Sequence, residues 1–269
     1  MNQGERRRFL IQALLKEQTA YRNIVTPADA EGQRQLLRGL MNIRAPRRTS
    51  AEFLQVQDAY LQGETAAKGV TDVADLTPIQ SGLYLWQGDI TTLKCDAIVN
   101  AANSGMTGCY VPNHRCIDNA IHTYAGVELR LACAELMEQQ GDPEPTGQAK
   151  ITPAFNLPCR YVLHTVGPII SGRVTKEDEE LLASCYRSCL ELAAENGLQS
   201  VAFCCISTGE FHFPNDLAAE IAVETVRQFM NRKTSVKKVI FNVFKDLDKA
   251  IYEKLLRADG AAESCAAGL

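Results

Sequence analysis

The sequence lacks the basic excess that is typical of proteins that bind the nucleic-acid backbone. Its 269 residues include 28 Lys and Arg against 32 Asp and Glu, which gives a net charge of −4. Residues 1–75 hold 11 basic and 9 acidic side chains, so the remainder, with 17 and 23, carries −6. A nucleic-acid-binding function is therefore disfavoured. Any phosphate bound by this acidic body must be held mostly by backbone N–H groups and helix ends.

A membrane span and an export signal are also missing. The longest stretch without charged residues, 97–114, is interrupted by three asparagines and a proline, whereas a span needs about 20 mostly apolar residues. The arginines near the N-terminus precede a short apolar run, but Gln12 divides it and no small-residue cleavage site follows. We therefore expect no contact with a membrane and a cytoplasmic location. The ten cysteines are then expected to be reduced thiols or metal ligands.

The first 75 residues predict a helical extension. Apolar residues recur at helical spacing within 9–14, which indicates a first helix. Thr26, with the proline that follows it, is expected to begin a second helix. Thr49 and Glu52 have the spacing of a capping box for a third.

From Gly82 onward, short apolar or alternating runs bounded by turn signals predict strands, with helices expected after Lys176 and Asn215. This alternation predicts a three-layer α/β/α fold with a central mixed, largely parallel sheet. We assign residues 1–75 to the helical extension and 76–258 to this domain, and we expect 259–269 to be a disordered tail. The six predicted strand runs are 82–89, 96–103, 147–154, 160–167, 200–207 and 237–244.

One loop carries a candidate metal site. Cys109, His114 and Cys116 lie within eight residues of a segment rich in Gly, Pro and Asn. Two thiolates and an imidazole suit a tetrahedral zinc ion, and a set of three leaves a fourth position open for water or substrate. The alternative is that these are scattered free thiols and a surface histidine. Spacing alone leaves both interpretations open.

Two further loops follow predicted strands, where open α/β sheets bind their ligands. Ser207, Thr208 and Gly209 form a turn before a helix, and successive N–H groups in such a turn can bind an anion. An ordinary strand-to-helix turn is the alternative, because so short a motif is weak evidence. Asp89 follows a glycine turn and could accept a hydrogen bond from an amino group such as that of adenine. It could equally cap the next turn.

Together these loops resemble the macrodomain family of ADP-ribose binders, and more closely its zinc-dependent bacterial branch of protein-ADP-ribose hydrolases. The motifs GDI, NAAN, IDNAIH, YAG and STGEF occur in the family's order, and the resemblance covers Gly82 to about Leu256. The segments LMNIRAP and EFLQVQDAYL resemble the N-terminal extension of that branch. Hydrolytic macrodomains ordinarily carry a glycine run between NAAN and the aspartate, and here Gly108 to Cys116 replaces it. This departure favours one zinc ion per chain, bound by Cys109, His114 and Cys116.

The resemblance implies roles for matching residues. Asp89 would hold the adenine amino group beside the backbone of Ile90, and Phe244 would stack on the adenine ring. Asn103 would contact the distal ribose. The motif STGEF with His212 would wrap the pyrophosphate. The expected ADP-ribose contacts are Asp89, Ile90, Asn100, Asn103, Cys116, Ile117, Asp118, Ser207, Thr208, Gly209, Glu210, Phe211, His212 and Phe244.

The resemblance also implies an activity, the hydrolytic removal of mono-ADP-ribose from protein side chains, with an ester to Asp or Glu as the expected linkage. Asp118, Asn103 and Cys116 are the expected catalytic residues. Zinc would either lower the pKa of a bound water or grip the distal ribose, and Asp118 would act as a base or orient that water. The alternative is a non-catalytic reader of ADP-ribosylated proteins in which zinc only shapes the loop. His122 and His164 are expected to be structural residues outside the metal shell.

Overall fold

The computed structural model describes residues 1–21 and 23–258, so the tail expected over 259–269 lies outside the described residues. Its centre is a six-stranded sheet with the order β2-β8-β7-β4-β6-β5. All neighbouring strands are parallel except β5, which pairs antiparallel with β6. The strands are β2 (Leu83–Gln87), β4 (Ala97–Ala102), β5 (Ala149–Pro153), β6 (Tyr161–Val166), β7 (Ser200–Phe203) and β8 (Lys238–Val243). Each lies within one of the six predicted runs, so the mixed, largely parallel sheet is confirmed.

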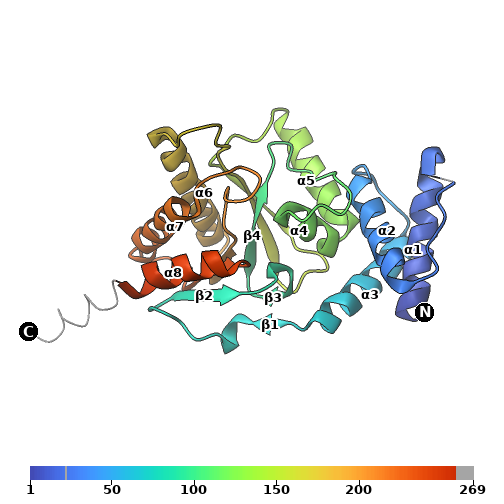
Figure 1. Ribbon diagram of the computed structural model, residues 1–269, viewed down its shortest axis with the longest axis horizontal. Coiled ribbons are helices and arrows are strands. Elements are labelled where there is room, and N and C mark those ends of the chain that lie inside the picture. The colour runs from blue at the N-terminus through green and yellow to red at the C-terminus, as the bar shows by residue number, and fades with distance from the viewer. Residues whose placement is uncertain (22, 259–269) are drawn as a thin grey trace, which may run out of the picture.

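Helices cover both faces of this sheet (Figure 1). On one side lie α6 (Lys176–Glu195), α7 (Asn215–Met230) and α8 (Asp246–Ala258). On the other lie α4 (Ile117–Ala125) and α5 (Val127–Gln140). The sheet is buried between them, since most side chains of β4, β6, β7 and β8 are inaccessible to solvent. The three-layer α/β/α prediction is therefore confirmed.

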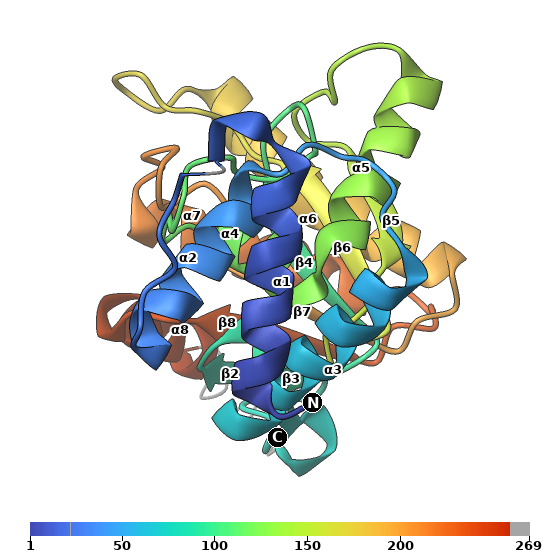
Figure 2. The same cartoon turned by 90° about the vertical axis from the view of Figure 1, so that its right-hand side faces the viewer.

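Three N-terminal helices pack against the α4–α5 side. They are α1 (Gln3–Glu17), α2 (Ala30–Ile43) and α3 (Ala51–Lys68), and α1 lies outermost (Figure 2). Their apolar faces form a second core, separate from that of the sheet, to which α5 contributes Val127. A short parallel pair, β1 (Thr71–Asp72) with β3 (Leu93–Lys94), follows them. None of the helices in the described part of the chain is long and apolar enough to cross a membrane.

The predicted starts of two N-terminal helices were wrong. Helix α2 is capped by Asp29, whose Oδ1 accepts the N–H of Gly32 at 2.7 Å, and Thr26 stays outside the helix. Helix α3 is capped by Ser50, whose hydroxyl accepts the N–H of Phe53 at 3.1 Å, one residue after the expected cap. In each case several residues that can cap a helix lie close together in the sequence. Tertiary packing decides which of them accepts hydrogen bonds from the free N–H groups of the first turn.

Candidate functional site

The candidate ligand-binding residues lie at the carboxyl ends of four strands that are consecutive across the sheet. Asp89 follows β2, Phe244 follows β8, the 204–214 turn follows β7, and Asn103 follows β4. Neighbouring strands lie about 4.8 Å apart, so these four positions form a line roughly 14 Å long. Residues separated by more than 150 positions in the chain are thereby brought to one edge.

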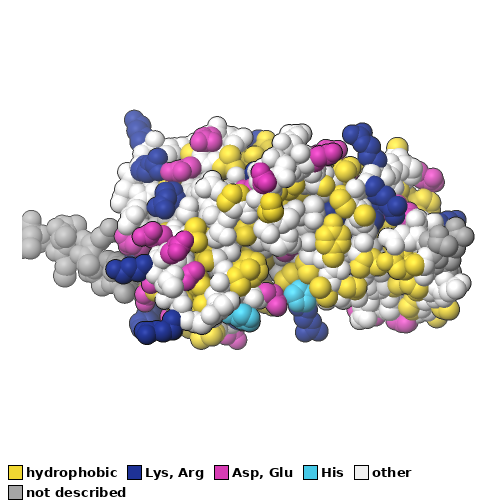
Figure 3. Space-filling model, turned by 90° about the horizontal axis from the view of Figure 1, so that it is seen from above, with side chains coloured by type: hydrophobic (Ala, Val, Ile, Leu, Met, Phe, Trp, Pro, Cys, Tyr) yellow, Lys and Arg dark blue, Asp and Glu magenta, His cyan; other side chains and the backbone are white. Residues whose placement is uncertain are grey.

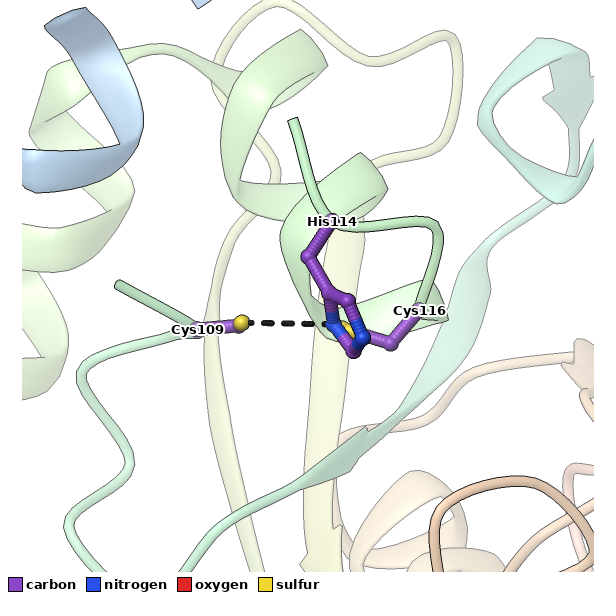
Figure 4. A group of neighbouring side chains, drawn as sticks. All are labelled: Cys109, His114 and Cys116. Atoms are coloured by element: carbon purple, nitrogen blue, oxygen red, sulfur yellow. Dashed lines mark hydrogen bonds between the residues drawn. The ribbon is translucent and has the colours of Figure 1, made fainter. Parts of the chain in front are cut away.

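The candidate metal site lies beside the β4 end of this line. The ligand atoms of Cys109, His114 and Cys116 all lie within 4.8 Å of one another, and Cys109 Sγ is 3.5 Å from His114 Nδ1 (Figure 4). All three side chains are partly buried. Two sulfurs and one imidazole nitrogen that converge in this way fit the donor set of a tetrahedral zinc ion.

Two neighbours orient these donors. Cys116 caps helix α4 and its sulfur accepts the N–H of Asn119, so it sits at the positive end of a helix dipole. The second ring nitrogen of His114, Nε2, lies 3.6 Å from a carboxylate oxygen of Glu210. A carboxylate facing the free nitrogen of a metal-ligating histidine is a common way to fix its ring. This contact also joins the metal loop to the turn that follows β7.

Asp118 lies in the first turn of α4, two residues beyond Cys116. Its Oδ1 accepts a hydrogen bond from Asn100 Nδ2 at 2.8 Å, and its Oδ2 accepts one from Asn103 Nδ2 at 3.4 Å. Burial raises the pKa of this carboxyl to about 6, an effect that the Asn100 hydrogen bond opposes. The amide of Asn103 also donates to the carbonyl of Gly108, next to the metal loop, at 3.2 Å. The two asparagines of NAAN therefore link the carboxylate with the start of that loop.

The turn after β7 has the geometry of an anion site. Ser207 and His212 both have left-handed backbone conformations, with φ of 64° and 57°, which are uncommon for residues with a side chain. Hydrogen bonds within the turn, including Phe213 N–H to the carbonyl of Ser207 at 2.9 Å, hold this shape. Among the described residues, no backbone carbonyl accepts a hydrogen bond from the N–H groups of 209–211. Successive free N–H groups of this kind can bind a phosphate oxygen.

At the far end of the line, Asp89 caps the 3₁₀ helix Ile90–Thr92 as the sequence alternative allowed. Its Oδ1 accepts the backbone N–H of Thr91 at 3.0 Å and the Thr91 hydroxyl at 2.6 Å, while its Oδ2 pairs with Lys68 at 2.8 Å. Lys68 ends α3, and sequence reasoning missed it because 21 residues separate the partners. The ring of Phe244, on the adjacent strand end, is 77% exposed and therefore free to stack on a planar ligand.

A second group of candidate ligands, His122, Cys133 and His164, lies buried between α4, α5 and the sheet. Its hydrogen bonds argue against a metal. His164 Nδ1 is 3.2 Å from Asn100 Nδ2, and its Nε2 is 2.9 Å from the hydroxyl of Thr152. Since an amide nitrogen donates, His164 Nδ1 accepts and its proton resides on Nε2, which leaves that nitrogen no lone pair for a metal. Burial lowers the pKa of His164 to about 3, so the ring is neutral.

The surface view from above shows histidine and acidic side chains close together, with hydrophobic side chains gathered beside them (Figure 3). A mixed α/β sheet with its polar residues at the carboxyl ends of parallel strands defines a class of ligand-binding α/β proteins. Comparison with known proteins narrows this class. A family model described as "Macro domain" matches residues 99–222.

A protein from Treponema medium named "Protein-ADP-ribose hydrolase" is 59% identical over 260 residues, which cover 95% of this chain and 100% of that protein. A Staphylococcus aureus protein of the same name is 51% identical, over 93% of this chain and 95% of its own. The solved Trypanosoma brucei macrodomain in complex with ADP-ribose is 30% identical with a TM-score of 0.63, covering 81% of this chain and 94% of that one. The chain belongs to the macrodomain family.

Proposed function

We propose that this protein hydrolyses the bond between mono-ADP-ribose and a modified protein side chain. The observation that carries the proposal is the line of strand ends, which matches the order of chemical groups in ADP-ribose. Phe244 and Asp89 offer a stacking surface and an acceptor for adenine, and the 207–212 turn offers N–H groups for the pyrophosphate. Asn103 and Asp118 stand where the distal ribose would lie, beside the candidate metal group. Two relatives named "Protein-ADP-ribose hydrolase" support the same activity.

The residues present fit a zinc ion, and Cys109, His114 and Cys116 would hold it. When bound, zinc would supply Lewis-acid chemistry, either by lowering the pKa of a water or by gripping the distal ribose. The three-residue set leaves a position for an exchangeable ligand. The Glu210 carboxylate approaches the non-ligating nitrogen of His114 and would fix the orientation of its ring.

We infer that the linkage is an ester to Asp or Glu. In this reaction the bond between the anomeric carbon and the carboxylate oxygen breaks, water supplies the hydroxyl group, and the side-chain carboxylate leaves. Asp118 would accept the proton of that water or orient it, and the hydrogen bonds from Asn100 and Asn103, which fix both of its oxygens, support this role. Asn103 would contact the distal ribose through its side-chain amide. Cys116 would act as a ligand of the metal.

The decisive experiment incubates the zinc-loaded protein with a carrier protein that bears ADP-ribose on glutamate, and follows free ADP-ribose with time. We expect release from the ester-linked carrier and none from a carrier modified on arginine. Binding of both carriers without release would instead favour a reader module. Asp118→Asn is the control variant, because it keeps the size of the side chain but removes the carboxylate that would accept the proton.

A further inference from the structure

The loop that carries the candidate metal ligands has almost no hydrogen bonding of its own. Among the described residues, the only backbone–backbone bond within 109–115 runs from His114 N–H to the carbonyl of Val111, at 3.2 Å. Asn113 also has a left-handed conformation, with φ of 57°, which is tolerated best by Gly, Asn and Asp. Such a segment does not hold one shape by itself, so groups outside it must fix its backbone.

Helix α2 of the N-terminal extension supplies two of these groups. The side chain of Asn42, which is 1% exposed, accepts the backbone N–H of Asn113 at 2.9 Å. The guanidinium of Arg38 donates to the carbonyl of His114, the metal-ligand candidate itself, at 2.9 Å. At Gly39, between them, a Cβ atom would lie 3.4 Å from the Asn113 side chain, so the helix backbone lies directly against the loop.

Arg38 also acts on the loop through a buried asparagine on α4. Its Nε and Nη2 donate to Asn119 Oδ1 at 3.2 and 2.8 Å, and Asn119 Nδ2 donates to the carbonyl of Val111 at 3.0 Å. Asn119 is completely buried, so its amide has no water with which to exchange these partners. Backbone groups at Val111, Asn113 and His114 are therefore each fixed by a side chain from outside the loop.

We propose that α2 is part of the metal centre, and that Arg38 and Asn42 are positioning residues that hold His114 where its ring meets Cys109 and Cys116. This inference rests on the metal centre of the proposed function. It assigns to the extension, which we place at residues 1–75, the task of organising a site whose ligands all lie in the macrodomain.

The physical reason is preorganisation. A metal ion gains affinity when its ligands already converge, because no conformational entropy is then lost on binding. Groups that orient ligands without touching the metal typically change its affinity by about 10- to 100-fold when they are removed. A merely structural contact would change the stability of the extension and leave the metal affinity unchanged.

The test measures metal affinity directly. Arg38→Met keeps much of the aliphatic stem but removes the guanidinium. Arg34→Met is the matched control, since Arg34 lies one turn earlier on the same helix and pairs only with Glu31 in the described contacts. Arg38→Lys keeps the charge without the forked donor. For each full-length protein, Co²⁺ is titrated against a chelator of known affinity while thiolate-to-cobalt absorption is recorded. ADP-ribose affinity and thermal unfolding are measured in parallel.

We expect Arg38→Met to weaken Co²⁺ binding by about 10- to 100-fold, Arg38→Lys to lie between it and the wild type, and Arg34→Met to match the wild type. ADP-ribose affinity should change much less, because the adenine and pyrophosphate contacts lie elsewhere. Equal Co²⁺ affinity in Arg38→Met and Arg34→Met would overturn the inference while leaving the metal centre intact. Equal losses of metal affinity, ADP-ribose affinity and stability would also overturn it, as they indicate general unfolding. A wild type that binds no Co²⁺ or Zn²⁺ would overturn this inference and the proposed metal centre, whereas the hydrolase activity is tested separately by the release of ADP-ribose.

Discussion

The stability of this protein should fall as the pH falls below about 7, and His164 should account for a measurable share of that loss. Burial holds the pKa of this histidine at about 3, against 6.5 in an ordinary environment. Below about pH 6.5, His164 therefore binds a proton in the unfolded chain but stays unprotonated in the folded protein. The free energy of unfolding therefore decreases as the pH falls from about 6.5 to about 3.

The magnitude follows from the two pKa values. Between about pH 7.5 and about pH 5.5, a histidine with these values lowers the free energy of unfolding by about 1.4 kcal/mol. His122, whose pKa burial also lowers, adds a contribution of the same sign. Asp118 opposes both, since its raised pKa makes the folded protein bind a proton before the unfolded chain does, and this stabilises the folded protein as the pH falls from about 6 to 3.8. The contribution of His164 must therefore be isolated as a difference between proteins.

The assay is urea-induced unfolding at both pH values, followed by the fluorescence of Trp86, the single tryptophan. In His164→Gln the change in unfolding free energy between the two pH values should be smaller than in the wild type by about 1.4 kcal/mol. His212→Gln, at an exposed position, serves as the control. If His164→Gln keeps the full pH dependence of the wild type, the histidine titrates normally in the folded protein. The buried, neutral ring that the structure assigns to His164 would then be wrong.

Three further results are expected. Asp89→Ala should weaken ADP-ribose binding in calorimetry by roughly 1–3 kcal/mol without changing zinc content, and unchanged affinity would place adenine recognition elsewhere. Phe244→Ala should weaken ADP-ribose binding by roughly 0.5–1.5 kcal/mol beyond any loss of contact area with no change in the melting temperature, because the ring is 77% exposed. Cys116→Ala should abolish metal binding and ADP-ribose release while the protein stays folded, since the cores of the sheet and the extension are built from other residues. Global unfolding of that variant would indicate a structural metal.

The fold could be predicted from the sequence because its strands carry a local signal. Runs such as 160–167 and 237–244 are apolar or alternating and end in turn residues, so each specifies its own conformation. The sheet then follows from the alternation of strands and helices. Capping is less predictable, as Ser50 shows, because adjacent residues of similar chemistry compete for the same N–H groups.

The candidate site was predictable only where its residues are close in sequence. Cys109, His114 and Cys116 form a local pattern, and the structure brings their ligand atoms together. The partners of that loop were not predictable, because Arg38 and Asn42 lie more than 70 residues away from the groups that they bind. Neither residue stands out in the sequence, where an arginine and an asparagine on a helix ordinarily face solvent.

Arg130, a buried arginine on α5, forms part of the junction between the extension and the macrodomain. Its guanidinium donates to the carbonyls of Met41, Asn42 and Arg44 at the end of α2, and to the carbonyl of Cys109 in the metal loop.

These acceptors are main-chain atoms, so they remain in place whatever side chains the chain acquires around them. The bonds of Arg130 to the end of α2 therefore tolerate substitution of the side chains of Met41 and Arg44, as long as the helix ends there. Substitution of Arg130, by contrast, removes four bonds at once and has no local remedy. Arg130 therefore ties the end of α2 and the start of the metal loop to one buried side chain of α5.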